Sequence, residues 1–329
     1  MRTATQTVIS GGLAILAALG VPSSALSQGD WPSKPLTFIS PAPASSAEYL
    51  PRIIYEPVAK ALGTVLIIDY KQGLGGTLAL EAVARSAPDG YTLGLPSLGS
   101  LGIATTVQAS SLRYDPLKDF AGVARLVTTG NVIAANKDLP VGSVRELIDY
   151  AKARPGKLNF GAIAGFGTSY HLAWVLFAKR VGIDVVQIPF KGVTDAMQAV
   201  VGGDVEITMS NTNTLLAMIQ SGRMKALAVT SATREPSLPN VPTMIESGIT
   251  GYEATSWFGV VVRAGTPQAV IDRLTAATLK SLQDPQVIAS LQKIGVTPYP
   301  QRGKEFEAFY HSEITRWAQV VKDSGFKVH

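Results

Sequence analysis

The sequence contains no cysteine. Disulfide bridges, thiolate nucleophiles, zinc ribbons and iron–sulfur clusters are therefore excluded across all 329 residues. The chain has three histidines, His171, His311 and His329, which are few and far apart in the sequence. A metal site would have to consist of carboxylates alone, so we expect neither a metal nor a cofactor.

Charged residues are also scarce. They make up 16% of the chain, whereas soluble domains typically carry about 25%. Hydrophobic residues make up 46%, enough for one large or two medium domains that each bury a core. The lysines and arginines are scattered and do not alternate with aromatic residues, so we expect no nucleic-acid partner.

The first 27 residues resemble a secretory signal peptide. Arg2 precedes an uncharged apolar run at 8–21, and Ala25 and Ser27 offer small residues at positions −3 and −1 of a cleavage site. The apolar run is shorter than the roughly 20 residues of a membrane-spanning helix. Cleavage near Ser27 leaves 28 basic and 24 acidic residues, a net charge of +4. We expect an exported, periplasmic protein, and its charge weakly favours an anionic small ligand.

Short apolar runs alternate with amphipathic stretches along the rest of the chain. This order predicts an α/β fold with parallel strands flanked by helices. The expected strands are 36–39, 65–68, 91–95, 132–136, 158–162, 184–189 and 205–209, and the expected helices are 47–62, 77–86, 144–153 and 169–181.

Other local patterns refine this outline. Ser143 and Glu146 form a capping box at the start of the helix at 144–153. The proline-rich segment 229–242 predicts a long exposed loop. Two apolar stretches, 120–135 and 256–262, are long or extended enough to run through one sheet and cross into a second body.

At four places an expected strand is followed by a small, polar turn and then by a helix. Helix N-termini offer unpaired N–H groups and a partial positive charge, so several such turns together would bind a carboxylate or phosphate. Ligands of α/β folds lie at the carboxyl ends of strands, where these turns fall. Tight strand-to-helix turns also need small residues without any ligand, and this alternative stays open. The turns are 44–47, 73–77, 165–169 and 191–194.

Enzymatic motifs are incomplete. Gly73 and Gly75 resemble a dinucleotide-binding turn, but Leu78 stands where the third glycine is required. No Gly-x-Ser-x-Gly motif and no Walker loop occur. An exported hydrolase that uses Ser97 or Ser169 remains an alternative. We expect His171 to pack or hydrogen-bond locally at the start of its helix, with ligand contact as the second option.

Nine segments, in order along the whole mature chain, resemble the Bug family, the periplasmic solute receptors of tripartite tricarboxylate transporters. These segments are Trp31-Pro-Ser-Lys-Pro35, Ala87-Pro-Asp-Gly-Tyr-Thr-Leu93, Tyr114-Asp-Pro-Leu-Lys-Asp-Phe120, Pro155-Gly-Lys-Leu-Asn-Phe160, Pro189-Phe-Lys-Gly192, Ala226-Leu-Ala-Val-Thr-Ser231, Leu238-Pro-Asn-Val-Pro-Thr243, Gly251-Tyr-Glu-Ala-Thr-Ser-Trp-Phe-Gly259 and Trp317-Ala-Gln-Val-Val-Lys-Asp-Ser-Gly325.

The resemblance implies a two-lobed periplasmic binding protein of the type II Venus-flytrap fold, in which each lobe is a sheet flanked by helices. We expect a signal peptide at 1–27, lobe 1 from 28–128 and 253–329, and lobe 2 from 129–252. The partners it implies are a small carboxylate, bound in the cleft between the lobes, and the membrane permease subunits of the transporter. It also implies no covalent chemistry, and we expect a monomer. A solute sensor for a membrane signalling partner is the alternative.

Two departures from the family pattern bear on the ligand. Pro43-Ala-Ser-Ser-Ala-Glu48 stands where the family usually has Pro-Gly-Gly-Gly-Thr-Asp, which adds hydroxyl groups to the first turn. Phe166 lies between two glycines of the lobe 2 turn. An aromatic ring there favours a ligand with a flat apolar face, such as a terephthalate-like or protocatechuate-like acid, unless Phe166 only packs under its loop.

The candidate ligand-binding residues follow from these turns and from the strand ends beside them. Lys191 is the one strong cation among them, although it could instead support its own loop. Asn211 and Thr212 are candidates for the distal end of a longer ligand. The full set is Ala44, Ser45, Ser46, Ala47, Glu48, Gly75, Ser97, Gly99, Phe166, Gly167, Thr168, Ser169, His171, Lys191, Asn211 and Thr212.

Overall fold

The computed structural model describes residues 31–41, 49–71, 73–163, 165 and 167–324. The predicted signal peptide, the first turn at 44–48 and Phe166 lie outside these residues. From Trp31 onward the chain forms one compact unit by its internal contacts. The lobe boundaries after residues 128 and 252 stay a prediction.

Strands and helices alternate through the first two thirds of the chain, as the sequence predicts. The strands are β1 (Leu36–Ser40), β2 (Leu66–Tyr70), β3 (Thr92–Gly94), β4 (Phe120–Asn136), β5 (Asn159–Ala162), β6 (Val186–Pro189), β7 (Ile207–Asn211), β8 (Met224–Val229), β9 (Thr255–Arg263) and β10 (Thr297–Arg302). The helices and helical turns are η1 (Pro51–Tyr55), α2 (Glu56–Ala61), η2 (Leu74–Gly76), α3 (Thr77–Ala84), η3 (Leu98–Ile103), α4 (Ala104–Val107), α5 (Val144–Lys152), α6 (Ser169–Val181), α7 (Val193–Gly202), α8 (Thr212–Gln220), α9 (Gln268–Ser281), α10 (Pro285–Lys293) and α11 (Gly303–Ser324).

The strands form two sheets that share β4. In sheet A the order is β2-β1-β3-β9-β4, with β10 also paired to β4. Its strands β1, β2 and β3 are parallel, so their carboxyl ends meet at one edge. In sheet B the order is β4-β7-β5-β6, with β8 also on β4, and β5, β6 and β7 are parallel.

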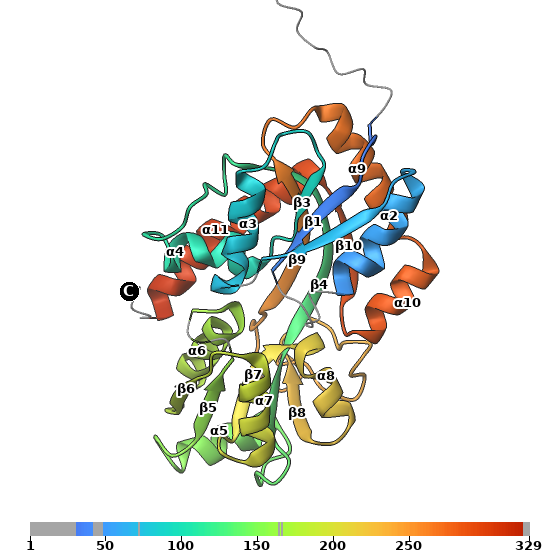
Figure 1. Ribbon diagram of the computed structural model, residues 1–329. Helices are drawn as coiled ribbons and strands as arrows, with labels where there is room; N and C mark the ends of the chain where they lie inside the picture. The colour runs from blue at the N-terminus through green and yellow to red at the C-terminus, as the bar shows by residue number, and fades with distance from the viewer. Residues whose placement is uncertain (1–30, 42–48, 72, 164, 166, 325–329) are drawn as a thin grey trace, which may run out of the picture. The chain divides into compact units, whose positions relative to one another are not determined.

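Strand β4 crosses from one sheet to the other. Gly130 is its last residue paired with β9, opposite Thr255, and Asn131 is its first residue paired with β7, opposite Asn211. Figure 1 shows β4 running from the strands of sheet A down to β7 and β8. The crossing expected for 120–135 is confirmed. The crossing expected for 256–262 is wrong, because β9 pairs only within sheet A. The chain returns to sheet A through the residues just before β9.

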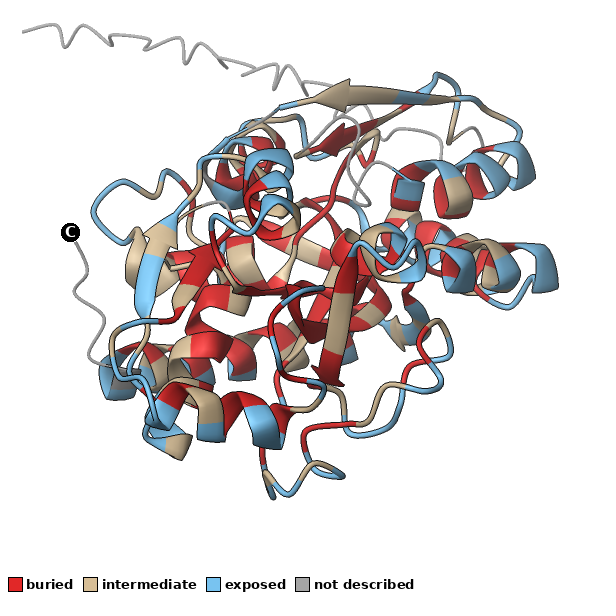
Figure 2. Ribbon diagram, turned by 90° about the horizontal axis from the view of Figure 1, so that it is seen from below, coloured by how far each residue is buried: buried red, intermediate tan, exposed pale blue. Residues whose placement is uncertain are grey.

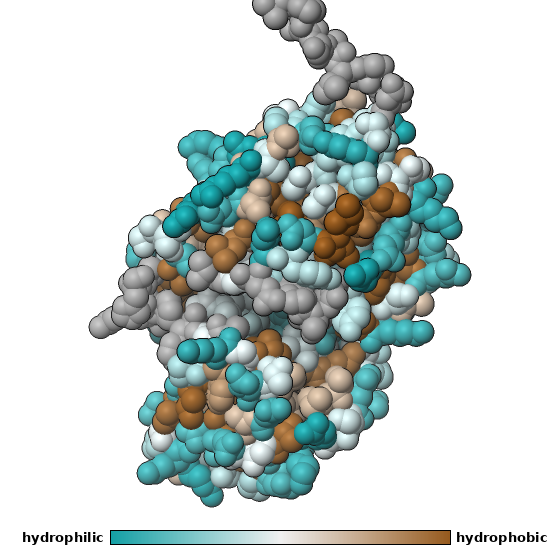
Figure 3. All heavy atoms as spheres, in the orientation of Figure 1, coloured by the Kyte–Doolittle hydropathy of each residue, from teal (hydrophilic) through white to brown (hydrophobic). Residues whose placement is uncertain are grey.

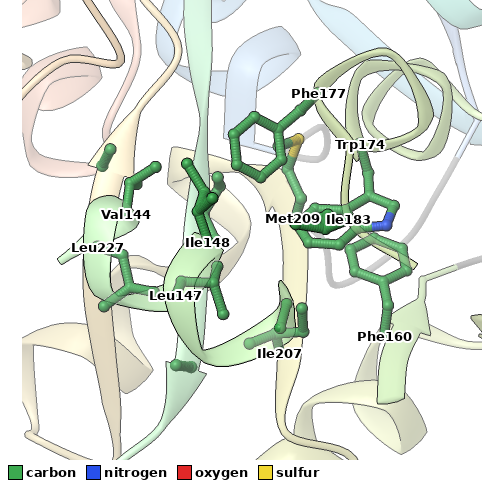
Figure 4. Packing of buried hydrophobic residues seen from close by; sticks show 14 of the residues in the cluster. Val144, Leu147, Ile148, Phe160, Trp174, Phe177, Ile183, Ile207, Met209 and Leu227 are labelled. Carbon is green, nitrogen blue, oxygen red and sulfur yellow. The ribbon is translucent and has the colours of Figure 1, made fainter. Parts of the chain in front are cut away.

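Each sheet has its own apolar core. In sheet B, Trp174 of α6 stacks on Phe160 of β5 with ring centroids 4.3 Å apart, beside Phe177 and Met209 (Figure 4). Sheet A is covered on both faces, by η1, α2, α9 and α10 on one and by α3, η3 and α11 on the other. Figure 2 shows buried residues along the strands and exposed residues on the outer faces of helices.

Helix α6 belongs to both cores. Trp174 packs into the core of sheet B, whereas Leu172 packs with Leu98 of η3 and Trp317 of α11. Lys179 near the end of α6 also donates a hydrogen bond to the carbonyl of Asp323 in α11. Helix α6 thereby contacts elements of sheet A through its first turn, at Leu172, and through its last turn, at Lys179.

Two local predictions need correction. Ser143 accepts a hydrogen bond from the N–H of Glu146 as expected, but the Glu146 carboxylate accepts the N–H of Gly142 instead of that of Ser143. The loop at 229–242 is not exposed throughout, because Glu235 and Leu238 are buried. Glu235 Oε1 accepts the N–H of Gly130 at 2.6 Å, which holds this part of the loop inside.

The surface carries isolated apolar residues. Val65 is 61% exposed, and Ile67 on the edge strand β2 is 50% exposed. Figure 3 shows hydrophilic side chains over much of the face in view and several apolar groups, the largest at the upper right. Among the described residues, no helix is both long enough and apolar enough to span a membrane.

Candidate functional site

Two turns of sheet A lie side by side at the carboxyl ends of its parallel strands. Gly75 and Gly76 have φ values of 67° and 96°, a left-handed conformation that glycine adopts readily, and they lead into α3. Ser97 is the N-cap of η3, where it exchanges hydrogen bonds with Ser100. A Cβ at Gly99 would lie 3.9 Å from the carbonyl oxygen of Gly75. The structure thus brings Gly75, Ser97 and Gly99 together.

The turn before α6 supplies the part of the site that comes from sheet B. Gly167 has φ 80°, and Thr168 caps the helix by accepting the N–H of His171. The Ser169 hydroxyl lies 3.4 Å from that of Ser256 on β9. Strand β9 also bridges to Ser97 through Phe258. The helix start therefore contacts the same strand as the sheet A turn, and a helix N-terminus is a favourable place for an anion.

His171 has a structural role in this arrangement. Its Nδ1 accepts the N–H of Gly167 at 3.0 Å, so Nε2 must carry the proton and donate it to Gln187 Oε1 at 2.7 Å. Burial is the main cause that lowers the pKa of His171, and the hydrogen bond to Gln187 opposes it. The neutral imidazole holds the turn at Gly167 through this hydrogen bond. This agrees with the local hydrogen bonding expected for His171.

Asn211 and Thr212 lie at the crossover of β4. Thr212 donates a hydrogen bond to the carbonyl of Gly130, and it is fully buried. Asn211 and its strand partner Asn131 each have a buried side-chain oxygen without a hydrogen-bond partner among the described residues. Such atoms call for a donor from water or ligand.

The remaining candidates separate into two groups. Lys191 is exposed just beyond the end of β6, at the outer edge of sheet B. Phe166 and the first turn, with Ala44, Ser45, Ser46, Ala47 and Glu48, lie outside the described residues. Their contribution to the site stays a prediction.

Sequence reasoning missed several polar residues beside these turns. Ser256 falls in an apolar stretch that pointed only to a crossing strand, and Asn131 lies inside another. Gln187 is one polar residue in a short strand, and Glu235 is one of several polar residues in a proline-rich loop. Their importance depends on contacts between distant segments, and no local pattern signals such contacts.

The part of the chain that the structure describes holds no cluster of three or more side chains suited to a metal ion. A cavity of about 340 Å³ lies between α9 and Arg302 of β10, on the outer side of sheet A. None of the candidate residues lines it, so we do not assign the ligand to it.

A family model described as the tripartite tricarboxylate transporter family receptor matches residues 50–326. The chain belongs to this family. BugT of Bordetella pertussis is 32% identical over 315 residues, which cover 95% of this chain and 96% of BugT. The protein is accordingly a solute-binding receptor of the periplasmic Bug type.

Solved structures confirm the predicted two-lobed fold. Rpa4515 of R. palustris, solved with adipate, has 31% sequence identity and a TM-score of 0.84, over 90% of this chain and 99% of its own. MatC from Rhodopseudomonas palustris, solved with bound malate, has 31% identity and a TM-score of 0.78, over 88% of this chain and 100% of its own. The periplasmic binding protein BugD has 29% identity and a TM-score of 0.80, over 90% and 99%.

Proposed function

We propose that this receptor captures a small carboxylate in the cleft between its lobes and delivers it to the membrane permease of a tripartite transporter. The family match over residues 50–326 carries the proposal. Neighbours solved with adipate and with malate support a carboxylate ligand. The turns that begin η3 and α6 would supply N–H and hydroxyl donors for such an anion.

The finer proposal is an aromatic dicarboxylate such as terephthalate. It rests on Phe166, whose ring would contact a flat apolar ligand face. Calorimetric titration of the wild type and of F166A with terephthalate, protocatechuate, malate and citrate tests it. We expect F166A to lose affinity for the aromatic acids only. Equal affinity of both proteins for every acid would remove the aromatic proposal and leave the carboxylate proposal intact.

We further propose that the receptor catalyses no reaction. Both ring nitrogens of His171 have partners other than Ser169, and the Ser97 hydroxyl is engaged with Ser100. Among the residues that the structure describes, neither serine is therefore paired with His171 as a general base. The purified chain should hydrolyse p-nitrophenyl esters no faster than S97A or S169A. Turnover that one of these substitutions abolishes would favour the hydrolase alternative.

Export and partners complete the proposal. The leader at 1–27 would direct secretion and be cleaved near Ser27, and the mature chain would act as a monomer beside permease subunits. N-terminal sequencing of periplasmic protein tests the cleavage. Solute uptake by a strain that lacks the receptor distinguishes transport from a sensing role, because a sensor's loss would leave uptake by existing permease unchanged.

A further inference from the structure

Glu313 is a buried acid on α11, outside the candidate site, and it is only 4% exposed. Its Oε2 accepts the indole N–H of Trp257 at 3.3 Å and the indole N–H of Trp317 at 3.3 Å. Its Oε1 accepts Nη1 of Arg316 at 2.9 Å. An indole has a single N–H and no acceptor, so both rings direct their one polar group at this carboxylate.

Trp257 connects Glu313 to β9, the strand that both halves of the candidate site contact. The residue before Trp257 is Ser256, whose hydroxyl lies 3.4 Å from that of Ser169. The residue after it forms the bridge to Ser97. The ring of Trp257 is buried, so its position is set by its neighbours and by its hydrogen bond to Glu313. A displacement of this ring would move the backbone that carries both site contacts.

Trp317 connects Glu313 to the two helix starts of the candidate site. It packs in one apolar cluster with Leu172 of α6 and Leu98 of η3. Leu172 lies in the first turn of α6, and Leu98 is the first residue of η3. Helix α11 contacts both of these elements. One carboxylate therefore holds the two rings that pack beside the elements carrying the site.

A charge role is the alternative to this hydrogen-bonding role. Arg316 forms an ion pair with Glu313, and its own side chain is half exposed. Arg125 of β4 is buried and lies within range of the charge on Glu313. A buried ion pair often adds little net stability, because the loss of hydration offsets the attraction. The hydrogen bonds to the indoles, in contrast, join β9 to α11 and orient the ring that α11 presents to α6 and η3.

We propose that Glu313 is a positioning residue for ligand capture. Its carboxylate fixes the rings of Trp257 and Trp317, and these rings set the spacing between the turns at Ser97 and Ser169. The inference rests on the proposed function, since it assumes that both turns bind one ligand. Donors held at the correct spacing before the ligand arrives cost less to order on binding, so the positioned site binds more tightly.

The first test needs no ligand and compares E313L with E307L. Glu307 lies on the same helix, and its Oε1 accepts the N–H of Gly122 at 2.7 Å. Both substitutions remove a buried acceptor from α11, but only E313L frees the two indoles. We expect the indole N–H resonances of Trp257 and Trp317 to shift in E313L and to exchange faster with solvent. The variants W257F and W317F assign these resonances.

The backbone amide resonances of Ser97 and Ser169 give the decisive readout. They should shift in E313L and stay in place in E307L. Unchanged resonances in E313L, or equal shifts in both variants, would overturn the proposal. If E313L does not fold, E313M carries the same comparison, because its side chain keeps the length of glutamate and its sulfur is only a weak acceptor.

The conservative variant E313Q separates hydrogen bonding from charge. Its amide oxygen can still accept the indole N–H groups, and Arg316 can turn into solvent because it is half exposed. We expect E313Q to keep the resonances of Ser97 and Ser169 close to their wild-type positions. An E313Q variant that behaves as E313L does would show that the charge matters and would overturn the positioning role of the hydrogen bonds.

Calorimetric titration with malate and adipate then tests ligand capture. If the competent arrangement falls to about a tenth of the molecules, E313L binds about tenfold more weakly than the wild type. E307L and E313Q should stay within about threefold of the wild type, which corresponds to a competent fraction above about a third. Equal affinity of E313L and the wild type, or equal losses in E313L and E307L, would contradict the proposal.

The two experiments separate this inference from the proposed function. If neither acid binds the wild type, the carboxylate proposal fails for these ligands, and the amide resonances of Ser97 and Ser169 decide the inference by themselves. If an acid binds the wild type and E313L equally well, the proposed function stands and the role of Glu313 is refuted.

Discussion

His171 lies among the candidate ligand residues, and its hydrogen bonds predict a specific titration. Burial lowers its pKa below the ordinary 6.5. The unfolded chain therefore binds a proton more readily than the folded one. The stability that depends on His171 is fully present above about pH 6.5 and falls as pH drops below it. NMR titration of the imidazole should give a pKa below that of a free histidine.

The variant H171A tests the structural role of the ring. It leaves the N–H of Gly167 without its acceptor, so we expect a loss of about 1–3 kcal/mol in the free energy of unfolding at neutral pH. In H171A the free energy of unfolding should also depend less steeply on pH just below pH 6.5. An imidazole that titrates normally, together with an unchanged unfolding midpoint, would show that the ring is free to meet solvent or ligand.

Glu235 makes the opposite prediction for stability. A raised native pKa means that the folded chain binds the proton more tightly, so the contribution to stability is present below about pH 4.5 and lost as pH rises through the native pKa. The buried carboxylate of Glu235 thus costs stability at neutral pH. The melting temperature of E235Q minus that of the wild type should increase from acid to neutral pH, and a constant or decreasing difference would argue against a desolvated carboxylate.

The turns of the candidate site were predictable one at a time. Small residues before a helix are a local pattern, and Gly167 and Thr168 stand before α6 as that pattern predicts. Ser97 was a candidate without a predicted helix after it, and the structure shows that it caps η3. The contact between Ser169 and Ser256 joins residues 87 positions apart. No periodic sequence pattern connects such residues, so only the structure shows which residues lie together in the candidate site.

Among the elements, β9 and α11 illustrate close packing through a glycine. A Cβ at Gly259 would lie 2.1 Å from Cζ of Phe306, well inside van der Waals contact. We expect G259A to lower the free energy of unfolding by about 1–3 kcal/mol, the usual cost of overpacking. Chemical denaturation measures it. G142A is the control, because its nearest neighbour is the mobile end of Glu146 at 3.6 Å; equal stability of the two variants would contradict the packing.

Elements with strong periodicity were predicted well. The helix at 169–181 has the bounds that the sequence indicated, and strands β1, β5 and β6 lie within one or two residues of their predicted starts. The loop at 229–242 was harder, because composition alone does not show that Glu235 is buried and accepts the N–H of Gly130. The sheet that β9 joins depends on its pairing partners, and a local sequence pattern does not identify those partners.

For the whole molecule, the resemblance to a known family predicted more of the fold than the periodic sequence patterns did. Alternating elements gave the α/β class, but they did not give two lobes. Segments spread over the entire mature chain gave the family, which the match over residues 50–326 confirms. The sharing of α6 between cores, with Leu172 on η3 and α11, came from neither source. It arises from how the sheets meet at the crossover.

The central claim is that the molecule captures a carboxylate, and thermal unfolding of the leader-free protein with a panel of aliphatic, amino and aromatic mono- and dicarboxylates tests it most directly. A ligand at about 100 times its dissociation constant adds roughly 2.7 kcal/mol to the stability of the folded state. We predict a clear upward shift with one class of carboxylate, after unfolding and refolding to remove any copurified solute. No shift with any carboxylate after that treatment would contradict the account.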